Sequence, residues 1–237
     1  TAELTKYASN AFLATKITFI NEIADLCEAV GANVQDVARG MGLDGRIGQK
    51  FLHAGPGFGG SCFPKDTIAL ARTSEDFGSP IQLVNTVIAV NKLRRGQMAD
   101  KVIEACGGTV ADDNIAILGL TFKPNTDDIR NAPSLDIILA LQAAGARISV
   151  YDPVGMTAAG KHLKGVVWGS SAYDILDGAR ALVIITEWNE FRALDLGRIR
   201  SLMATPLIVD LRNIYGLEDM REEAIRYVSV GRPEITQ

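Results

Sequence analysis

The apolar positions of the first hundred residues recur at helical spacing. From 2 to 30 an apolar side chain returns every three or four residues, which predicts one long amphipathic helix that ends at "VGAN". "NVQDVARGMG" predicts a short helix capped by Asn33. Two more helices are predicted over 64–77 and 80–106, each beginning with a proline. The second of these is long enough to serve as a strut or a dimer seam.

Beyond residue 108 the pattern changes to short runs rich in β-branched residues. They alternate with helical stretches, which predicts a parallel, doubly wound sheet. The expected strands are 115–120, 147–152, 181–186 and 206–211. The sequence therefore predicts an α/β protein in which a helical domain, 1–108, precedes a Rossmann-like parallel-sheet domain, 109–237.

A glycine-rich stretch, 43–62, separates the short helix from the third. Its composition is that of a loop, yet Phe51, Leu52 and Phe58 are larger and more apolar than a solvated linker requires. Long loops that are held by buried side chains usually take part in ligand binding. We therefore expect this loop to form part of a binding site.

Composition and charge narrow the classes of partner. The chain has 47% hydrophobic and 22% charged residues and a net charge of -4, so no global basic field attracts nucleic acid or an anionic membrane. The longest apolar runs fall well short of the roughly 20 residues that span a bilayer. We expect neither a nucleic-acid nor a membrane partner. An anionic ligand would have to be held by local groups.

The three cysteines, Cys27, Cys62 and Cys106, show no paired or metal-like spacing. This favours reduced thiols in a cytoplasmic protein and no metal site.

The chain starts with threonine, already inside a helical pattern, so we expect it to be part of a longer protein.

Cys62 stands out because it lies between a run of glycines and Pro64, the start of a predicted helix. Free N–H groups and the dipole at the helix start, together with Lys65, favour the thiolate, which is the nucleophilic form. Gly59 and its neighbour Gly60 would let a substrate approach the backbone closely. The alternative is a small residue that merely fills a tight turn; the local pattern favours the nucleophile.

Three polar residues could assist such a thiolate. Asp66 lies in the first helical turn, where it either complements the helix dipole or handles a proton near Cys62. Lys6 and Asn10 are four residues apart and share a helix face, which is either solvated or aimed at a cavity. In the second case they could stabilise an oxyanion on a carbon bound to Cys62.

In the α/β half the first strand runs into "TFKPNTDDIRNAPS" and not into GxGxxG. This is a nucleotide-binding topology without the dinucleotide fingerprint. Phe122, Lys123 and Arg130 follow that strand, and Arg212 follows the last predicted strand, so all four are candidates for the ligand crevice at the strand ends. Asp152 precedes a proline and is interpreted as a turn residue.

His53 and His162 raise the alternative of a cysteine hydrolase. No third group that would orient a histidine is evident, which argues against this class.

Three stretches carry a resemblance to a known family. "AELTKYASNAFLATKITFINEIADLCE", "RIGQKFLHAGPGFGGSCFPKD" and "ILGLTFKPNTDDIRNAPS" resemble, in order and spacing, the central and C-terminal parts of the UDP-glucose 6-dehydrogenases, in the UDP-glucose/GDP-mannose dehydrogenase family. "GFGGSCFPKD" is more similar to the UDP-glucose enzymes than to those acting on UDP-N-acetyl sugars. GDP-mannose dehydrogenases share the GGSC and PKD elements and remain the main competitor.

The resemblance implies a reaction: oxidation of the sugar C6 alcohol to a carboxylate with two NAD+. It implies that Cys62 captures the aldehyde as a thiohemiacetal that becomes a thioester, with Lys6 and Asn10 stabilising oxyanions and Asp66 assisting proton movement. The implied ligands of UDP-glucose are Arg46 (from a neighbouring subunit), Phe51, His53, Gly57, Phe58, Gly59, Phe122, Lys123 and Arg212, with Lys6 and Asn10; Lys65 and Arg130, beside Cys62, would face NAD.

In this family the NAD-binding domain precedes the part that the chain resembles. We therefore expect that the chain does not turn over alone. The predicted helix 80–106 and the implied subunit-crossing Arg46 favour at least a homodimer. A non-catalytic module for nucleotide-sugar binding and dimerisation remains an alternative of a different class.

Overall fold

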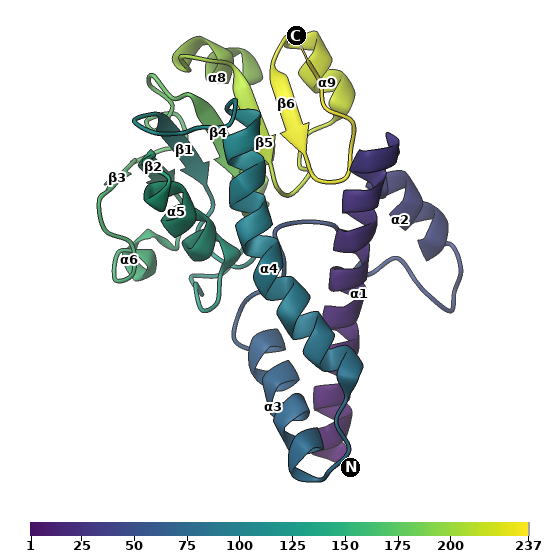
Figure 1. Ribbon diagram of the computed structural model, residues 1–237. Coiled ribbons are helices and arrows are strands. Elements are labelled where there is room, and N and C mark those ends of the chain that lie inside the picture. The colour runs from purple at the N-terminus through teal and green to yellow at the C-terminus, as the bar shows by residue number, and fades with distance from the viewer. Residues whose placement is uncertain (237) are drawn as a thin grey trace.

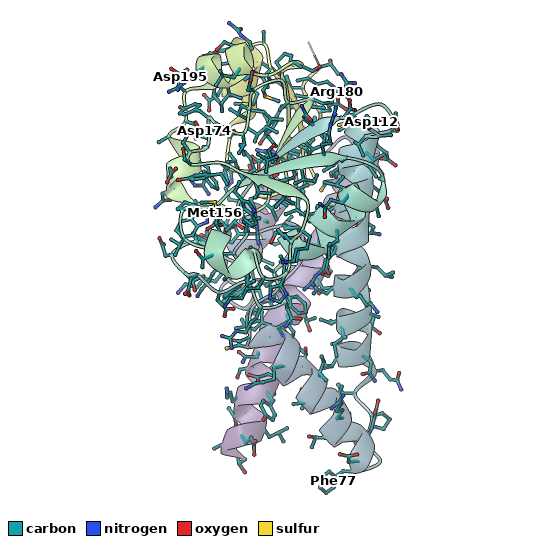
Figure 2. The ribbon with its side chains drawn as sticks, turned by 90° about the vertical axis from the view of Figure 1, so that its left-hand side faces the viewer. Phe77, Asp112, Met156, Asp174, Arg180 and Asp195 are labelled. Atoms are coloured by element: carbon teal, nitrogen blue, oxygen red, sulfur yellow. The ribbon has the colours of Figure 1, made fainter. Side chains whose placement is uncertain are left out.

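The computed structural model describes residues 1–236, and it consists of a helical arm joined to a parallel sheet with helices on both faces (Figure 1). The arm is formed by α1 (Ala2–Val30), α3 (Phe63–Asp76) and α4 (Gln82–Ala105), while α2 (Val34–Gly42) lies beside α1. Figure 2 shows Phe77 at the far tip of the arm, where it is 84% exposed. The predicted α/β class is confirmed.

The helix ends follow from local chemistry. Gly31 ends α1 with a φ of 74°, a left-handed conformation that glycine adopts without strain. The Asn33 side chain accepts a hydrogen bond from the Gln35 N–H, so the predicted cap of α2 is confirmed. The fourth helix starts later than predicted: Ile81 is still extended, and Pro80 lies before α4 and not in its first turn.

The sheet has six parallel strands in the order β3-β2-β1-β4-β5-β6. The strands are β1 (Asn114–Leu118), β2 (Arg147–Tyr151), β3 (Val166–Trp168), β4 (Ala181–Ile184), β5 (Leu207–Asp210) and β6 (Arg226–Ser229). Four of them match the predicted strands; β3 and β6, at the two edges, were not predicted. The remaining helices are α5 (Pro133–Ala143), α6 (Met156–Ala159), α7 (Asn189–Arg192), α8 (Leu196–Leu202) and α9 (Leu217–Glu222).

Alternate residues of β1 face two apolar cores. Ile115 and Ile117 pack with α4 and α5, whereas Ala116 and Leu118 pack with α7, α8 and α9. Because both faces are covered, the central strands are almost wholly buried. The first core continues into α1, so the inner end of the arm is fixed to the sheet next to the loop 43–62.

Candidate functional site

A cavity of about 380 Å³ lies between the glycine-rich loop and the carboxyl ends of β1, β4 and β5. This is where a parallel α/β sheet binds its ligands. The cavity brings together eight of the predicted ligand-binding residues: Phe51, His53, Gly57, Phe58, Gly59, Phe122, Lys123 and Arg212. It also has four lining residues that sequence reasoning missed, namely Ile17, Lys50, Phe63 and Glu187.

Two glycines allow the loop to meet the sheet half without a gap. A Cβ at Gly59 would lie 2.3 Å from the Asn131 carbonyl oxygen, and one at Gly60 would lie 2.7 Å from the Phe122 ring. Gly60 also has a φ of 82° and donates its N–H to the Arg130 carbonyl at 2.8 Å. Only glycine fits both positions, so the glycines serve close backbone packing as well as access for a ligand.

Aromatic rings form much of the cavity wall. Phe63 lies 6.1 Å from both Phe51 and Phe58, centroid to centroid, and Lys123 Nζ lies 5.4 Å from the centroid of Phe122. These rings offer flat apolar surface to a base or a sugar, with an ammonium beside them.

Arg212 is held at the cavity edge by backbone carbonyls. Its Nε donates to Ile185 O at 2.9 Å and its Nη2 to Phe122 O at 3.4 Å. Glu187 Oε2 lies 3.1 Å from Nε, an ion pair too bent to be a hydrogen bond. The guanidinium therefore ties the loops after β1, β4 and β5 into one wall.

Asp66 lies at the centre of a second cluster, at the start of α3. Its carboxylate is completely buried and accepts a hydrogen bond from Asn10 Nδ2 at 2.7 Å. Lys6 Nζ lies 3.8 Å from Oδ2, and Lys65 Nζ lies 3.8 Å from Oδ1. Oδ1 accepts no hydrogen bond from the part of the chain that the structure describes, which leaves a buried acceptor open to a proton donor. The structure thus joins Lys6 and Asn10 of α1 to Asp66.

Cys62 is the residue before the first turn of α3, and its side chain is exposed, whereas Cys27 and Cys106 are buried. Its sulfur lies 3.8 Å from the Ser61 hydroxyl. Arg130 lies near Cys62. The pKa of Arg130 is raised, mainly by the hydrogen bond to Asp128 and to a lesser extent by the charge of Cys62. Cys62 is adjacent in sequence to Phe63 of the cavity wall, although it does not itself line the cavity.

Comparison with known proteins gives the family. Residues 1–93 match the UDP-glucose/GDP-mannose dehydrogenase family, central domain, and residues 116–217 match its UDP binding domain. The chain belongs to this family. It is similar to UDP-glucose 6-dehydrogenase of Rhizobium meliloti, with 62% identity over 234 residues, and to UDP-glucose 6-dehydrogenase TuaD of Bacillus subtilis, with 47% identity over 235 residues.

Each of these alignments covers 99% of the chain, but only 54% and 51% of the relative, so the chain spans about half the length of the curated relatives it matches. A solved UDP-glucose dehydrogenase from Pyrobaculum islandicum superposes with a TM-score of 0.85 at 35% identity, over 97% of this chain and 51% of that one. A GDP-mannose dehydrogenase shares the fold, with a TM-score of 0.59 at 22% identity over 95% of this chain and 52% of that one.

Other predicted residues lie outside the cavity. Arg46 is 89% exposed and pairs with Asp44, whose pKa its guanidinium holds below the usual value. His53 lines the cavity, while His162 is exposed beyond α6, and neither hydrogen-bonds to Cys62 within the described residues.

Asp152 begins a turn after β2, as predicted, and does more. It is fully buried and accepts hydrogen bonds from Leu120 N at 2.7 Å, Gly155 N at 2.6 Å and Trp188 Nε1 at 3.1 Å. It therefore fixes the strand ends behind the cavity.

The described residues contain neither a metal cluster nor a membrane-spanning helix. No group of three or more His, Cys, Asp or Glu side chains among them could hold a metal ion. Of the helices that the structure describes, none combines the length and apolar character needed to cross a membrane.

Proposed function

We propose that this chain is the substrate-binding and thiol-bearing part of a UDP-glucose 6-dehydrogenase, which converts UDP-glucose and water to UDP-glucuronate with two NAD+. The observation that carries the proposal is the strand-end cavity that joins Phe51, Phe58, Lys123 and Arg212 next to Cys62. The similarity to named UDP-glucose 6-dehydrogenases supports the choice of reaction.

The cavity suits a UDP-sugar. We assign the aromatic wall of Phe51, Phe58 and Phe122 to the flat rings of the ligand, and Lys123 and Arg212 to its polar groups. The backbone from His53 to Gly59 would wrap around the nucleotide sugar. Arg46, exposed in its own subunit, would be contributed to the site of a neighbouring subunit.

Cys62 would act as the nucleophile between two oxidations. Its thiolate adds to C6 of the aldehyde, and the carbonyl oxygen takes up a proton, which gives a thiohemiacetal. Loss of a hydride and the hydroxyl proton converts this to a thioester. Water then cleaves the C–S bond, releasing the carboxylate and restoring the thiol. Holding the aldehyde covalently prevents its escape between the two steps.

Lys6, Asn10 and Asp66 would support these steps. Lys6 and Asn10 place an ammonium and an amide near one another, so they can stabilise the oxyanions that form on C6. Asp66, with one carboxylate oxygen open, would accept or relay the protons.

NAD+ when bound accepts one hydride in each oxidation. The described residues fit only one side of this cofactor: Lys65 and Arg130 place two exposed cations beside Cys62, which suits a pyrophosphate. The sequence has no GxGxxG after β1, so a separate region of the protein would hold the rest of the dinucleotide.

We also propose a division into a helical domain, 1–108, and a UDP-sugar-binding domain, 109–237, and assembly as a homodimer or larger homo-oligomer. α1 carries large apolar residues that are exposed and spaced by seven: Phe12 (66%), Phe19 (45%) and Leu26 (56%). Such a stripe suits packing against a second copy.

A nucleophilic thiol also needs a reducing compartment, so we place the protein in the cytoplasm.

Calorimetric titration tests the substrate, and Cys62→Ser in the protein with its NAD-binding region tests the chemistry. We expect UDP-glucose to bind to the chain and GDP-mannose to bind far more weakly. The Cys62→Ser enzyme should carry out the first oxidation and stall before the carboxylate. Full conversion to UDP-glucuronate by this variant would refute the covalent scheme.

The alternatives give different results. A GDP-mannose dehydrogenase would reverse the order of the two affinities. A binding and dimerisation module would bind UDP-glucose, but its complete protein would form no NADH, with or without Cys62.

A further inference from the structure

The loop wall of the cavity is held from behind by one face of α4. Asn91, which is buried, accepts a hydrogen bond from Phe58 N at 2.8 Å and donates one to Phe58 O at 3.1 Å. Gly57 has a φ of 100°, and a Cβ there would lie 2.7 Å from Asn91 Oδ1. The backbone of Phe58, whose ring lines the cavity, is thus attached to α4 on its far side.

Arg95, one turn further along α4, joins this loop to the other half of the molecule. Its Nη2 donates to Phe58 O at 3.1 Å and to Asn131 O at 2.9 Å, while Nη1 pairs with Asp136 of α5. The side chain is only 14% exposed, and its Nε finds no hydrogen-bond partner among the described residues. A largely buried guanidinium with an unsatisfied N–H is costly, so the bonds that Arg95 makes to the two carbonyls and the carboxylate must offset that cost.

The two carbonyls that Arg95 joins belong to segments that meet at the site. Asn131 O is the atom that leaves no room for a Cβ at Gly59, and its neighbour Arg130 accepts the hydrogen bond from Gly60 N. Phe58 is a cavity wall, and the Arg130 carbonyl holds Gly60, two residues before Cys62. The Arg95 side chain therefore bonds to both segments.

We propose that Arg95 is a positioning residue that locks the glycine-rich loop onto the 130–131 backbone, and so sets the shape of the UDP-sugar cavity and the place of Arg130 beside Cys62. The proposal rests on the proposed function for the identity of the ligand. The lock itself is a property of the ligand-free chain. Lysine can replace arginine here only in part, because its ammonium is a compact point charge without the planar fork that spans two carbonyls and a carboxylate.

Hydrogen exchange of the ligand-free chain tests the lock. In Arg95→Ala we expect the amides of Phe58 and Gly60, which bond to Asn91 and Arg130, to exchange at least about tenfold faster, because the segments that carry them lose the charged donor that joins them. The amides of β1 should be unchanged, which separates local release from general destabilisation. Arg95→Lys should give an intermediate rate. Lys92→Ala, which removes an exposed cation on the same helix, should leave all of these rates as they are.

Calorimetry with UDP-glucose tests the consequence. We expect the dissociation constant to rise at least about tenfold in Arg95→Ala, to recover in part in Arg95→Lys, and to stay unchanged in Lys92→Ala. If Arg95→Ala does not fold, Arg95→Lys is compared with wild type by both measurements.

The outcomes separate the two proposals. Unchanged exchange at Phe58 and Gly60, or an equal increase in β1, would overturn the lock. Faster local exchange with unaltered UDP-glucose affinity would overturn its role in positioning. If exchange responds as expected but wild type binds no UDP-glucose, the lock stands and the proposed function fails.

Discussion

At the scale of single residues, Cys106 provides a pH test of burial. Removal from water raises the pKa of its thiol from 9.0 to about 11. Between these values an unfolded chain loses the thiol proton and the folded chain keeps it, so the free energy of unfolding falls as pH rises. By pH 10 we expect a loss of about 1 kcal/mol from this group.

Urea unfolding of wild type and Cys106→Ala at pH 8, 9 and 10 measures this effect. The substitution lowers stability at every pH, but it should make the decline between pH 8 and pH 10 shallower. Burial also raises the pKa of Cys27, so Cys27→Ala should make the decline shallower as well. Parallel declines in wild type and Cys106→Ala would contradict the prediction.

The sequence predicted the cavity residues better than their supports. Phe51 and Arg212, which line the cavity, could be predicted as candidates. Apolar anchors in a loop, and charges just after strands, are visible in the sequence itself. Asn91 and Arg95 were missed because polar residues on a helix usually face solvent. Their spacing with buried Met98 on α4 was the available clue, since it puts them on the inner face.

At the scale of elements, long periodic segments were predicted well and short edge strands were not. β3 has three residues, two of them exposed, and β6 contains an arginine and alternates in burial, so neither forms a continuous apolar run. Their place in the sheet comes from pairing with β2 and β5. Such pairing is a tertiary contact that a single sequence does not display.

The cap of α2 gives a prediction at this scale. Asn33→Ala removes the side-chain oxygen that accepts the Gln35 N–H, so we expect a loss of about 1 kcal/mol in the free energy of unfolding. Thermal or urea unfolding measures it. Asn33→Asp keeps an acceptor at the same position and should lose much less. Equal losses in the two variants would mean that the hydrogen bond is not the source of the stability.

At the scale of the whole molecule, the arm exposes more large apolar surface than a protein that works alone would be expected to carry. Besides the α1 stripe, Leu83 and Leu93 of α4 are 60% and 67% exposed. The exposed Arg46 adds a second reason to expect a neighbouring subunit, since it does not line the strand-end cavity of its own chain.

Phe19→Glu tests assembly through α1. A buried phenylalanine contributes roughly 1.5–3 kcal/mol, and a twofold interface contains it twice, so we expect the dimer dissociation constant to rise at least tenfold. Sedimentation velocity over a concentration series measures it. Phe77→Ser, at the tip of the arm, removes a similar ring outside the stripe and should leave assembly unchanged. Because Arg46 would then be missing from the site, the Phe19→Glu chain should also bind UDP-glucose more weakly, by an amount that Arg46→Ala reproduces without dissociating the dimer. A Phe19→Glu chain that sediments as wild type does would rule out α1 as the interface.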